Sequence, residues 1–209
     1  MRLADSAYTW PDEDNFASAA QIIRDGGIVA IPTESFYGLA ADPFNEQAVA
    51  RLYQLKHRDV SKPLLVIISE IHQLSELVRE VPECYSDLMN RFWPGPLTLV
   101  FPAVQTLPRI LTGGTSTIGV RFTSHPIAQH LITAFGRPIT ATSANISGCD
   151  PAESIAELDC RILDGIQGTL NGGKTPGGMC STIVGVSAGQ IYVKRTGQID
   201  LPGVPIKSD

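Results

Sequence analysis

Two groups of polar residues in the sequence have the types and spacing expected of a phosphate-binding site. The first lies in LKHRDVSKPLLVII, residues 55–68, where Lys56, Arg58 and Lys62 precede an apolar run. Lysine offers a compact positive charge, and arginine offers a planar fork that can hold two phosphate oxygens. Cations are also favourable at a helix C-terminus, so a structural role at the end of a helix is an equal alternative for these residues.

The second group lies in TATSANISG, residues 140–148, where small hydroxyl and amide side chains follow an apolar strand pattern. Ligands of α/β proteins bind beyond the carboxyl ends of strands. Ser143 and Asn145 are two residues apart, so an extended backbone would place both side chains on one face, where they could hold a phosphate or a ribose. The alternative is an ordinary polar turn with Asn145 in a left-handed conformation.

Two further segments contain candidate binding residues. In IPTESFYGL, residues 31–39, Pro32 and Gly38 frame a polar turn in which Thr33 could bind a small polar ligand, or which is an ordinary connection between strands. In TIGVRF, residues 117–122, Arg121 interrupts an apolar strand pattern. An unpaired buried charge is very unfavourable, so Arg121 requires a partner, either a substrate carboxylate or an acidic residue such as Glu34.

Several classes of protein are disfavoured by what the sequence lacks. It has no P-loop motif, no GxSxG motif and no HExxH spacing, and we assign no residue to a metal. The net charge of -5 argues against a dedicated duplex nucleic-acid binder. No CxxC motif, signal peptide or membrane-length apolar run is present, so we expect a cytoplasmic protein with free thiols and no membrane association.

The elements that must position these residues alternate between helices and strands. Periodicity and end signals predict helical segments at residues 12–24, 45–56, 71–78, 83–92, 125–135 and 151–158, and strands at 28–31, 64–68, 97–101, 117–122, 138–144, 181–186 and 190–195. Residues 36–41 fit either a strand or a tight connection, and the glycine-rich residues 171–178 fit either a loop over a site or a long turn. The pattern indicates one α/β or α+β domain with a mixed sheet.

The motifs PTESFYGLA, KHR, WPGPLTLV, TIGVR, TSANISG and STIV occur in this order over nearly the whole chain. As an ordered set they resemble the threonylcarbamoyl-AMP synthase family of the TsaC/YrdC type. The resemblance implies a twisted mixed sheet with flanking helices around a large, concave, basic cavity. It also implies that residues 1–209 form a single YrdC-like domain with its core at about 17–199, without the extra C-terminal domain of longer members.

The resemblance also implies a reaction. Members of the family condense L-threonine, bicarbonate and ATP, with Mg²⁺, to threonylcarbamoyl-AMP and release pyrophosphate. Partner proteins of the tRNA-modification pathway then transfer the threonylcarbamoyl group to adenosine 37 of tRNA. The resemblance leaves open whether tRNA itself binds weakly to the protein.

Family roles can be carried over to matching positions of this sequence. Lys56 and Arg58 match the phosphate-contacting, catalytic KxR pair, and Ser143 and Asn145 match the SxN pair on the same nucleotide. The remaining matches are, for ATP, Thr98, Thr142 and Arg195 and, for threonine, Thr33, Arg121 and Thr182. Three features depart from the family pattern: Asp59 replaces a common proline, Gly185 replaces a usual aspartate, and residues 171–178 are unusually rich in glycine.

Other functions remain as alternatives at this point. An RNA-binding module would use a basic cavity without turning over ATP. A paralogue of the same fold could catalyse another reaction, on a carbamoyl group or a sugar phosphate. A purely structural role would leave the cations at residues 56–62 unexplained.

Overall fold

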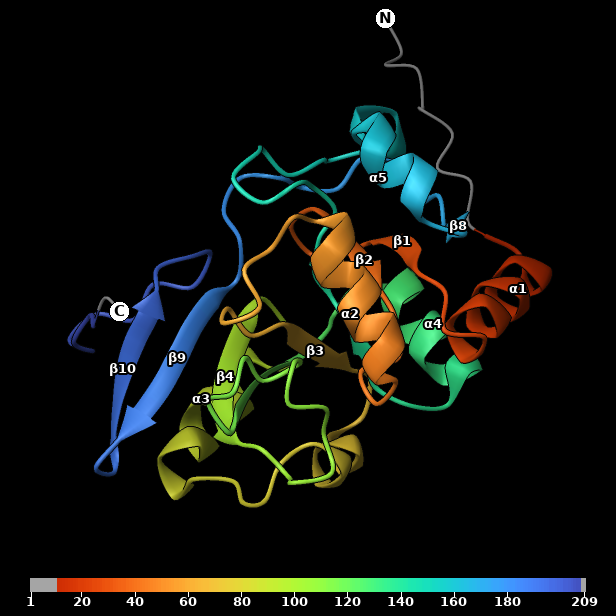
Figure 1. Cartoon of the computed structure of the whole chain (residues 1–209). Coiled ribbons are helices and arrows are strands. Elements are labelled where there is room, and N and C mark those ends of the chain that lie inside the picture. The colour runs from red at the N-terminus through yellow and green to blue at the C-terminus, as the bar shows by residue number, and fades with distance from the viewer. Residues whose placement is uncertain (1–10, 208–209) are drawn as a thin grey trace, which may run out of the picture.

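Two mixed β-sheets form the frame of the computed structural model, which describes residues 11–207 (Figure 1). The first sheet has the strand order β7-β2-β1-β8. β1 pairs antiparallel with β2 and parallel with β8, and β7 pairs antiparallel with the other edge of β2. The bounds are β1 (Val29–Pro32), β2 (Tyr37–Ala40), β7 (Thr142–Ser143) and β8 (Gly168–Thr169).

The second sheet has the order β10-β9-β4-β5-β3-β6 and contains both parallel and antiparallel pairs. β9 and β10 form a hairpin, drawn in blue in Figure 1, at one edge of this sheet. The strands predicted at residues 64–68, 97–101, 117–122, 181–186 and 190–195 are confirmed in this sheet, those at 117–122 and 190–195 residue for residue. The bounds are β3 (Leu65–Ile68), β4 (Leu97–Pro102), β5 (Thr117–Phe122), β6 (Ile139–Thr140), β9 (Thr182–Ser187) and β10 (Gln190–Arg195).

Three amphipathic helices were predicted with sound boundaries: α1 (Glu13–Arg24), α2 (Glu46–Leu55) and α4 (Pro126–Phe135). The side chain of Asp12 accepts a hydrogen bond at the start of α1, and the side chain of Asn45 does so at the start of α2. Gly136 ends α4 in the left-handed conformation that glycine adopts without strain. α1 and α4 lie side by side, and both contact the inner strand β1 of the first sheet (Figure 1).

The strand predicted at residues 138–144 is two strands that belong to different sheets. β6 pairs with β3 in the second sheet, and β7 pairs with β2 in the first. A continuous apolar and hydroxyl pattern does not reveal the crossing, which occurs at the buried Ala141. This short segment joins the two sheets and brings Ser143 next to the turn between β1 and β2.

The helical segment predicted at residues 83–92 is confirmed, as a 3-10 helix η2 (Glu83–Tyr85) followed by α3 (Ser86–Phe92). The predictions at 71–78 and 151–158 were too long, because these segments contain only the short 3-10 helices η1 (Ile71–Glu76) and η3 (Ile155–Glu157). The short helix α5 (Cys160–Gly165) was missed because it has only one buried residue, Ile162, and therefore too little apolar periodicity.

Two apolar clusters hold the layers together. One packs α1 and α4 against β1, through residues such as Phe16, Ile23 and Leu131. The larger one fills the space between α2 and the second sheet, with Tyr85 and Phe101 in edge-to-face contact. The four cysteines are free thiols, as predicted. Within residues 11–207, no helix has the length and apolar character needed to cross a membrane.

Candidate active site

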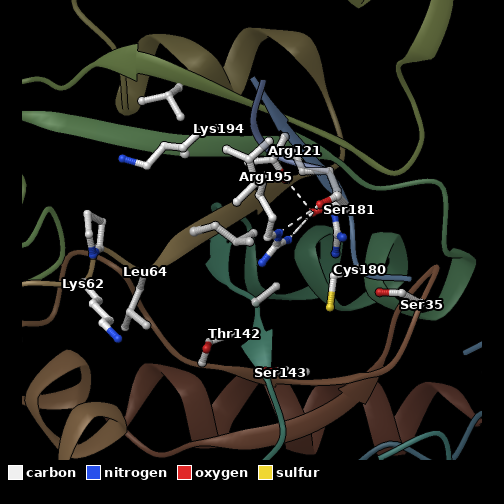
Figure 2. Close-up of a pocket in the computed structure, with 18 of the residues that line it drawn as sticks. Ser35, Lys62, Leu64, Arg121, Thr142, Ser143, Cys180, Ser181, Lys194 and Arg195 are labelled. Carbon is white, nitrogen blue, oxygen red and sulfur yellow. Dashed lines mark hydrogen bonds between the residues drawn. The ribbon is translucent and has the colours of Figure 1, made fainter. Parts of the chain in front are cut away.

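A cavity of about 640 Å³ is lined by residues of both sheets (Figure 2). Its walls come from the β1–β2 turn, the loop before β3, strands β4 and β5, residues 141–143 and the segments around β9 and β10. This volume lies within the range of cavities that bind small molecules. Seven of the ten predicted site residues line it: Thr33, Arg58, Thr98, Arg121, Thr142, Ser143 and Arg195.

The cavity wall carries a concentrated positive charge. Five cationic side chains line it, with no Asp or Glu among the lining residues: Arg58, Lys62, Arg121, Lys194 and Arg195. Burial of the Arg195 guanidinium, together with the positive charges of Arg121 and Arg58, lowers the pKa of Arg195. A cavity with this excess of like charges favours an anionic ligand.

Lys56 lies behind this wall rather than in it. Its side chain is 1% exposed, and its Nζ donates hydrogen bonds to Ser143 O, to Asn145 O at 2.6 Å and to Asn145 Oδ1 at 3.3 Å. We call this arrangement the Lys56 cluster. Burial, and then the charge of Arg58, lower the pKa of Lys56 to about 7. Lys56 therefore fixes the 143–145 loop, whose Ser143 faces the cavity.

Arg58 holds the loop that leads into β3. Its Nε donates to Lys62 O at 3.1 Å, and its Nη2 donates to Pro63 O at 2.9 Å. Asp59, where the family commonly has proline, accepts from Ser61 N at 2.9 Å and Ser61 Oγ at 2.8 Å. These hydrogen bonds close a turn, so Asp59 restricts the loop by side-chain bonding instead of by a proline ring.

The partner of Arg121 within the protein is Glu34, which is one of the two kinds of partner that the sequence predicted. Arg121 Nη2 lies 3.2 Å from Glu34 Oε2, and both side chains are less than a tenth exposed. Burial alone would raise the pKa of Glu34, but the charge of Arg121 and hydrogen bonds from Thr123 and Ser124 N outweigh it and lower the pKa. Arg121 Nε is buried without a hydrogen-bond partner, while the side chain lines the cavity.

Hydroxyl groups complete the wall. Thr33 Oγ1 donates to Phe36 O at 2.8 Å, which fixes the turn between β1 and β2. Thr98 Oγ1 and Ser181 Oγ are 2.9 Å apart, and Arg195 Nη2 donates to Ser181 O at 2.8 Å (Figure 2). Side chains from three distant parts of the chain therefore hold one another in position.

Like Lys56, two other predicted site residues, Asn145 and Thr182, do not line the cavity. Asn145 faces the Lys56 cluster, and its Nδ2 donates to Cys149 O at 2.5 Å. Thr182 is buried, with Oγ1 donating to Ile199 O at 2.7 Å. Because side chains alternate along a strand, the neighbours of Thr182, namely Ser181 and Ile183, are the ones that face the cavity.

Sequence reasoning missed several lining residues, among them Ser35, Cys180, Ser181 and Lys194. Ser35 lies two residues from the predicted Thr33, and Ser181 directly adjoins the predicted Thr182, so strand alternation was the signal that could have found Ser181. Lys194 precedes Arg195, and regular alternation would have placed only one of the two in the cavity.

The two other departures from the family pattern have local explanations. At Gly185 on β9, a Cβ atom would lie 2.6 Å from the Tyr192 ring, so glycine lets this ring cross the strand. The glycine-rich residues 171–178 are tied to the site: Gly177 N donates to Ser35 O at 2.7 Å, and Lys174 pairs with Glu153 at 2.9 Å. This segment therefore packs against the turn that contains Thr33.

These features define a class: an α/β protein whose two mixed sheets enclose a cation-lined cavity of ligand size. The comparison with protein families agrees with this class. The Sua5/YciO/YrdC family model, described as telomere recombination, matches residues 21–197. The chain belongs to this family.

Individual relatives share most of this sequence. The threonylcarbamoyl-AMP synthase of Pyrococcus abyssi is 41% identical over 183 residues, which cover 88% of this chain and 54% of the relative. That of Halorhodospira halophila is 42% identical over 162 residues, which cover 76% of this chain and 85% of the relative. The chain thus spans about half the length of the first relative and most of the second.

A solved structure extends the comparison to the backbone. The crystal structure of P. abyssi Sua5 complexed with L-threonine superposes with a TM-score of 0.88 at 36% identity, over 95% of this chain and 61% of that chain. The predicted fold class, a mixed α/β architecture with flanking helices, is confirmed.

Proposed function

We propose that this protein is a threonylcarbamoyl-AMP synthase, which condenses L-threonine, bicarbonate and ATP and releases pyrophosphate. The observation that carries the proposal is the cavity with five cationic lining residues and no lining carboxylate. Such a cavity suits a ligand with several negative charges, and ATP has four. Relatives of this family that bear the name threonylcarbamoyl-AMP synthase give further support.

The reaction has two steps. The amine of threonine attacks carbon dioxide formed from bicarbonate, so that an N–C bond forms, the nitrogen loses a proton and N-carboxythreonine results. A carboxylate oxygen of this intermediate then attacks the α-phosphorus of ATP. The new O–P bond forms as the bond from the α-phosphorus to its bridging oxygen breaks, and pyrophosphate leaves with that electron pair.

The lining residues have distinct tasks in this proposal. Arg58 and Arg195 bind phosphate oxygens, on which negative charge grows in the transition state. Arg121, which lines the cavity, binds the carboxylate of threonine, and Thr33 lies on the same turn as the Glu34 that holds Arg121. Lys56 and Asn145 act by holding Ser143 at the wall. The protein then contributes mainly position and charge.

Magnesium enters the proposal as part of the substrate. No group of three His, Cys, Asp or Glu side chains suited to a metal occurs within residues 11–207, and the cavity wall itself has no carboxylate. These residues do not fit a resident Mg²⁺, so the ion would arrive as the complex with ATP.

The product is a reactive mixed anhydride, so a second reaction must consume it. In the proposal, partner proteins transfer the threonylcarbamoyl group to adenosine 37 of tRNA in the cytoplasm. The exposed Cys149 and Cys160 are free thiols, which suits that reducing compartment.

An assay that measures pyrophosphate release while one substrate at a time is omitted tests the proposal. Purified protein receives ATP and Mg²⁺, with L-threonine or bicarbonate left out in turn. The expected result is release that needs both, that falls about a hundredfold in Arg58→Ala because one phosphate-binding charge is lost, and that is retained in Arg161→Ala, whose arginine pairs with Asp159 outside the cavity.

Release that is indifferent to threonine or bicarbonate would contradict the proposal and favour a paralogue with another reaction. No release, together with steeply salt-dependent binding of RNA, would favour the RNA-binding alternative.

A further inference from the structure

The hydroxyl group of Tyr53 contacts the loop that carries Arg58 to the cavity wall. Tyr53 lies on α2 and is 3% exposed, so its hydroxyl group must find its partners within the protein. Tyr53 Oη lies 2.9 Å from Lys62 O and 2.9 Å from Ile110 O, and it can donate its single proton to either carbonyl group. One hydroxyl group therefore joins α2 to the segment around Ile110 and to residues 58–64, which we call the Arg58 loop.

Arg58 and Tyr53 meet at the same carbonyl group. Arg58 Nε donates to Lys62 O at 3.1 Å, so this oxygen accepts hydrogen bonds from both side chains. Arg58 N also donates to Tyr53 O at 2.9 Å, which attaches the start of the Arg58 loop to the last turn of α2. Burial raises the pKa of Tyr53, and the charge of Arg58 and a hydrogen bond with its side chain oppose that rise without cancelling it. The two side chains therefore act on each other directly as well as through the loop.

The segment that contains the second carbonyl group packs closely against the Arg58 loop. Leu64 N donates to Leu111 O at 3.0 Å. A Cβ atom at Gly113 would lie 2.5 Å from Ser61 O, so this approach requires a glycine. The Tyr53 hydroxyl group thus lies where α2, the Arg58 loop and this segment meet.

We infer that Tyr53 is a positioning residue for Arg58, whose guanidinium its hydroxyl group keeps directed at the cavity. Arg58 donates to Lys62 O and to Pro63 O, so two of its five N–H donors are attached to the loop and move with it. A shift of the Arg58 loop therefore shifts the charge that Arg58 presents to an anionic ligand. The inference rests on the proposed function for the binding of phosphate oxygens by Arg58.

Tyr53→Phe separates the hydroxyl group from the ring, because the ring belongs to the larger apolar cluster and phenylalanine retains it. Isothermal titration calorimetry measures the affinity for inorganic pyrophosphate in wild type, Tyr53→Phe, Arg58→Lys and the variant with both changes. Lysine keeps the positive charge, so binding stays measurable, but it lacks the planar fork that spans the two carbonyl groups.

Tyr85→Phe is the matched control for the loss of a buried hydroxyl group. Tyr85 is buried like Tyr53, and its Oη also lies near two backbone carbonyl groups, at 2.8 Å from Val100 O on β4 and 3.4 Å from Val184 O on β9. The two variants should lose similar amounts of stability in urea unfolding. A general loss of stability would therefore affect pyrophosphate binding equally in both.

Pyrophosphate binding is expected to weaken about fivefold in Tyr53→Phe, the usual magnitude for one lost hydrogen bond, and to stay at the wild-type value in Tyr85→Phe. Arg58→Lys should also bind more weakly than the wild type. Adding Tyr53→Phe to Arg58→Lys should then cause little further loss, because the hydroxyl group acts through the arginine.

Three results would overturn the inference. They are a wild-type affinity in Tyr53→Phe, an equal loss in Tyr53→Phe and Tyr85→Phe, and a full further fivefold loss when Tyr53→Phe is added to Arg58→Lys. Each would show that the Tyr53 hydroxyl group does not act on the ligand through Arg58.

The assay of pyrophosphate release separates this inference from the proposed function. Threonine-dependent release with a Tyr53→Phe variant that binds pyrophosphate like the wild type supports the proposed function and contradicts the inference. Pyrophosphate binding that depends on Tyr53 through Arg58, in a protein without threonine-dependent release, supports the inference for an anion site and contradicts only the proposed function. Where both hold, Tyr53→Phe should raise KM for ATP about fivefold and leave KM for threonine nearly unchanged.

Discussion

Lys56 and Lys62 place the same ammonium group in two opposite settings, although they are close in sequence. Lys56 is 1% exposed and donates to oxygens of residues 143 and 145. Lys62 is exposed and lines a cavity whose lining residues include no carboxylate. Where buried oxygens surround the cation, it stabilises the fold. Where the cation is exposed on the cavity wall, an anionic ligand can reach it.

Arg121 is intermediate between these settings. Glu34 balances its charge, yet the side chain lines the cavity and its Nε has no hydrogen-bond partner. A guanidinium has five donors, so one edge can bind the protein while another stays available to a ligand carboxylate. The difference between the settings therefore follows from how many donors the protein itself satisfies.

Lys56→Met should produce the largest effect of any change to these cations. Methionine has a similar length but no donors, so the buried carbonyl groups of Ser143 and Asn145 lose their partner. We expect the free energy of unfolding to fall by about 3 kcal/mol, as for other unsatisfied buried polar groups. Urea unfolding measures this fall, and a variant as stable as the wild type would show that Lys56 is not a structural cation.

Glu34→Gln should have the next largest effect, and its effect should depend on pH. The folded protein lowers the pKa of Glu34, so the carboxylate contributes stability above its unfolded value of about 4.5. That contribution is lost as pH falls through the lower folded pKa. The variant leaves Arg121 without its counter-charge and should lose about 2 kcal/mol at neutral pH.

Unfolding of Glu34→Gln and wild type in urea, from neutral pH down to values below the lowered pKa of Glu34 in the folded protein, measures this dependence. The two proteins should converge at the acidic end, because Glu34 is then protonated in both folded and unfolded wild type. A constant difference in the free energy of unfolding at all pH values would indicate lost packing and contradict an electrostatic role.

A change in ionic strength should have the smallest effect of these tests, and it should act differently on the exposed cavity cations and on the buried Lys56. Raising salt from about 0.05 M to about 0.5 M shortens the screening length severalfold, which weakens interactions of exposed charges far more than those of buried ones. Pyrophosphate binding should therefore weaken in the wild type and much less in the Lys62→Gln, Lys194→Gln double variant. The loss of stability caused by Lys56→Met should be the same at both salt concentrations.

Local signals in the sequence were sufficient for much of the fold. Capping by Asp12 and Asn45 marked two helix starts, Gly136 marked a helix end, and the apolar pattern of β5 gave that strand residue for residue. The crossing between sheets at Ala141 was not visible, because pairing with β3 on one side and β2 on the other is set by tertiary contacts.

The candidate site shows the same limit. The ordered motifs identified segments that do meet at one cavity, and the expectation that Arg121 needs a partner led to Glu34. Motif spacing could not tell that Lys56 faces the 143–145 loop while Arg58 faces the cavity, since both flank a helix end. Nor could it place Lys194 in the wall, because a bulge breaks the alternation on which such a prediction depends.

The central claim is that the Lys56 cluster stabilises the fold and that the exposed cations of the cavity wall, Lys62 among them, bind an anionic ligand. Urea unfolding with and without inorganic pyrophosphate tests it most directly, on wild type, Lys56→Met and the Lys62→Gln, Lys194→Gln double variant. Without pyrophosphate, the account predicts a less stable Lys56→Met protein and a double variant as stable as the wild type. With pyrophosphate, the wild type should gain stability, and the double variant should gain much less. A double variant that is destabilised without ligand, or that gains as much stability from pyrophosphate as the wild type, would contradict the account.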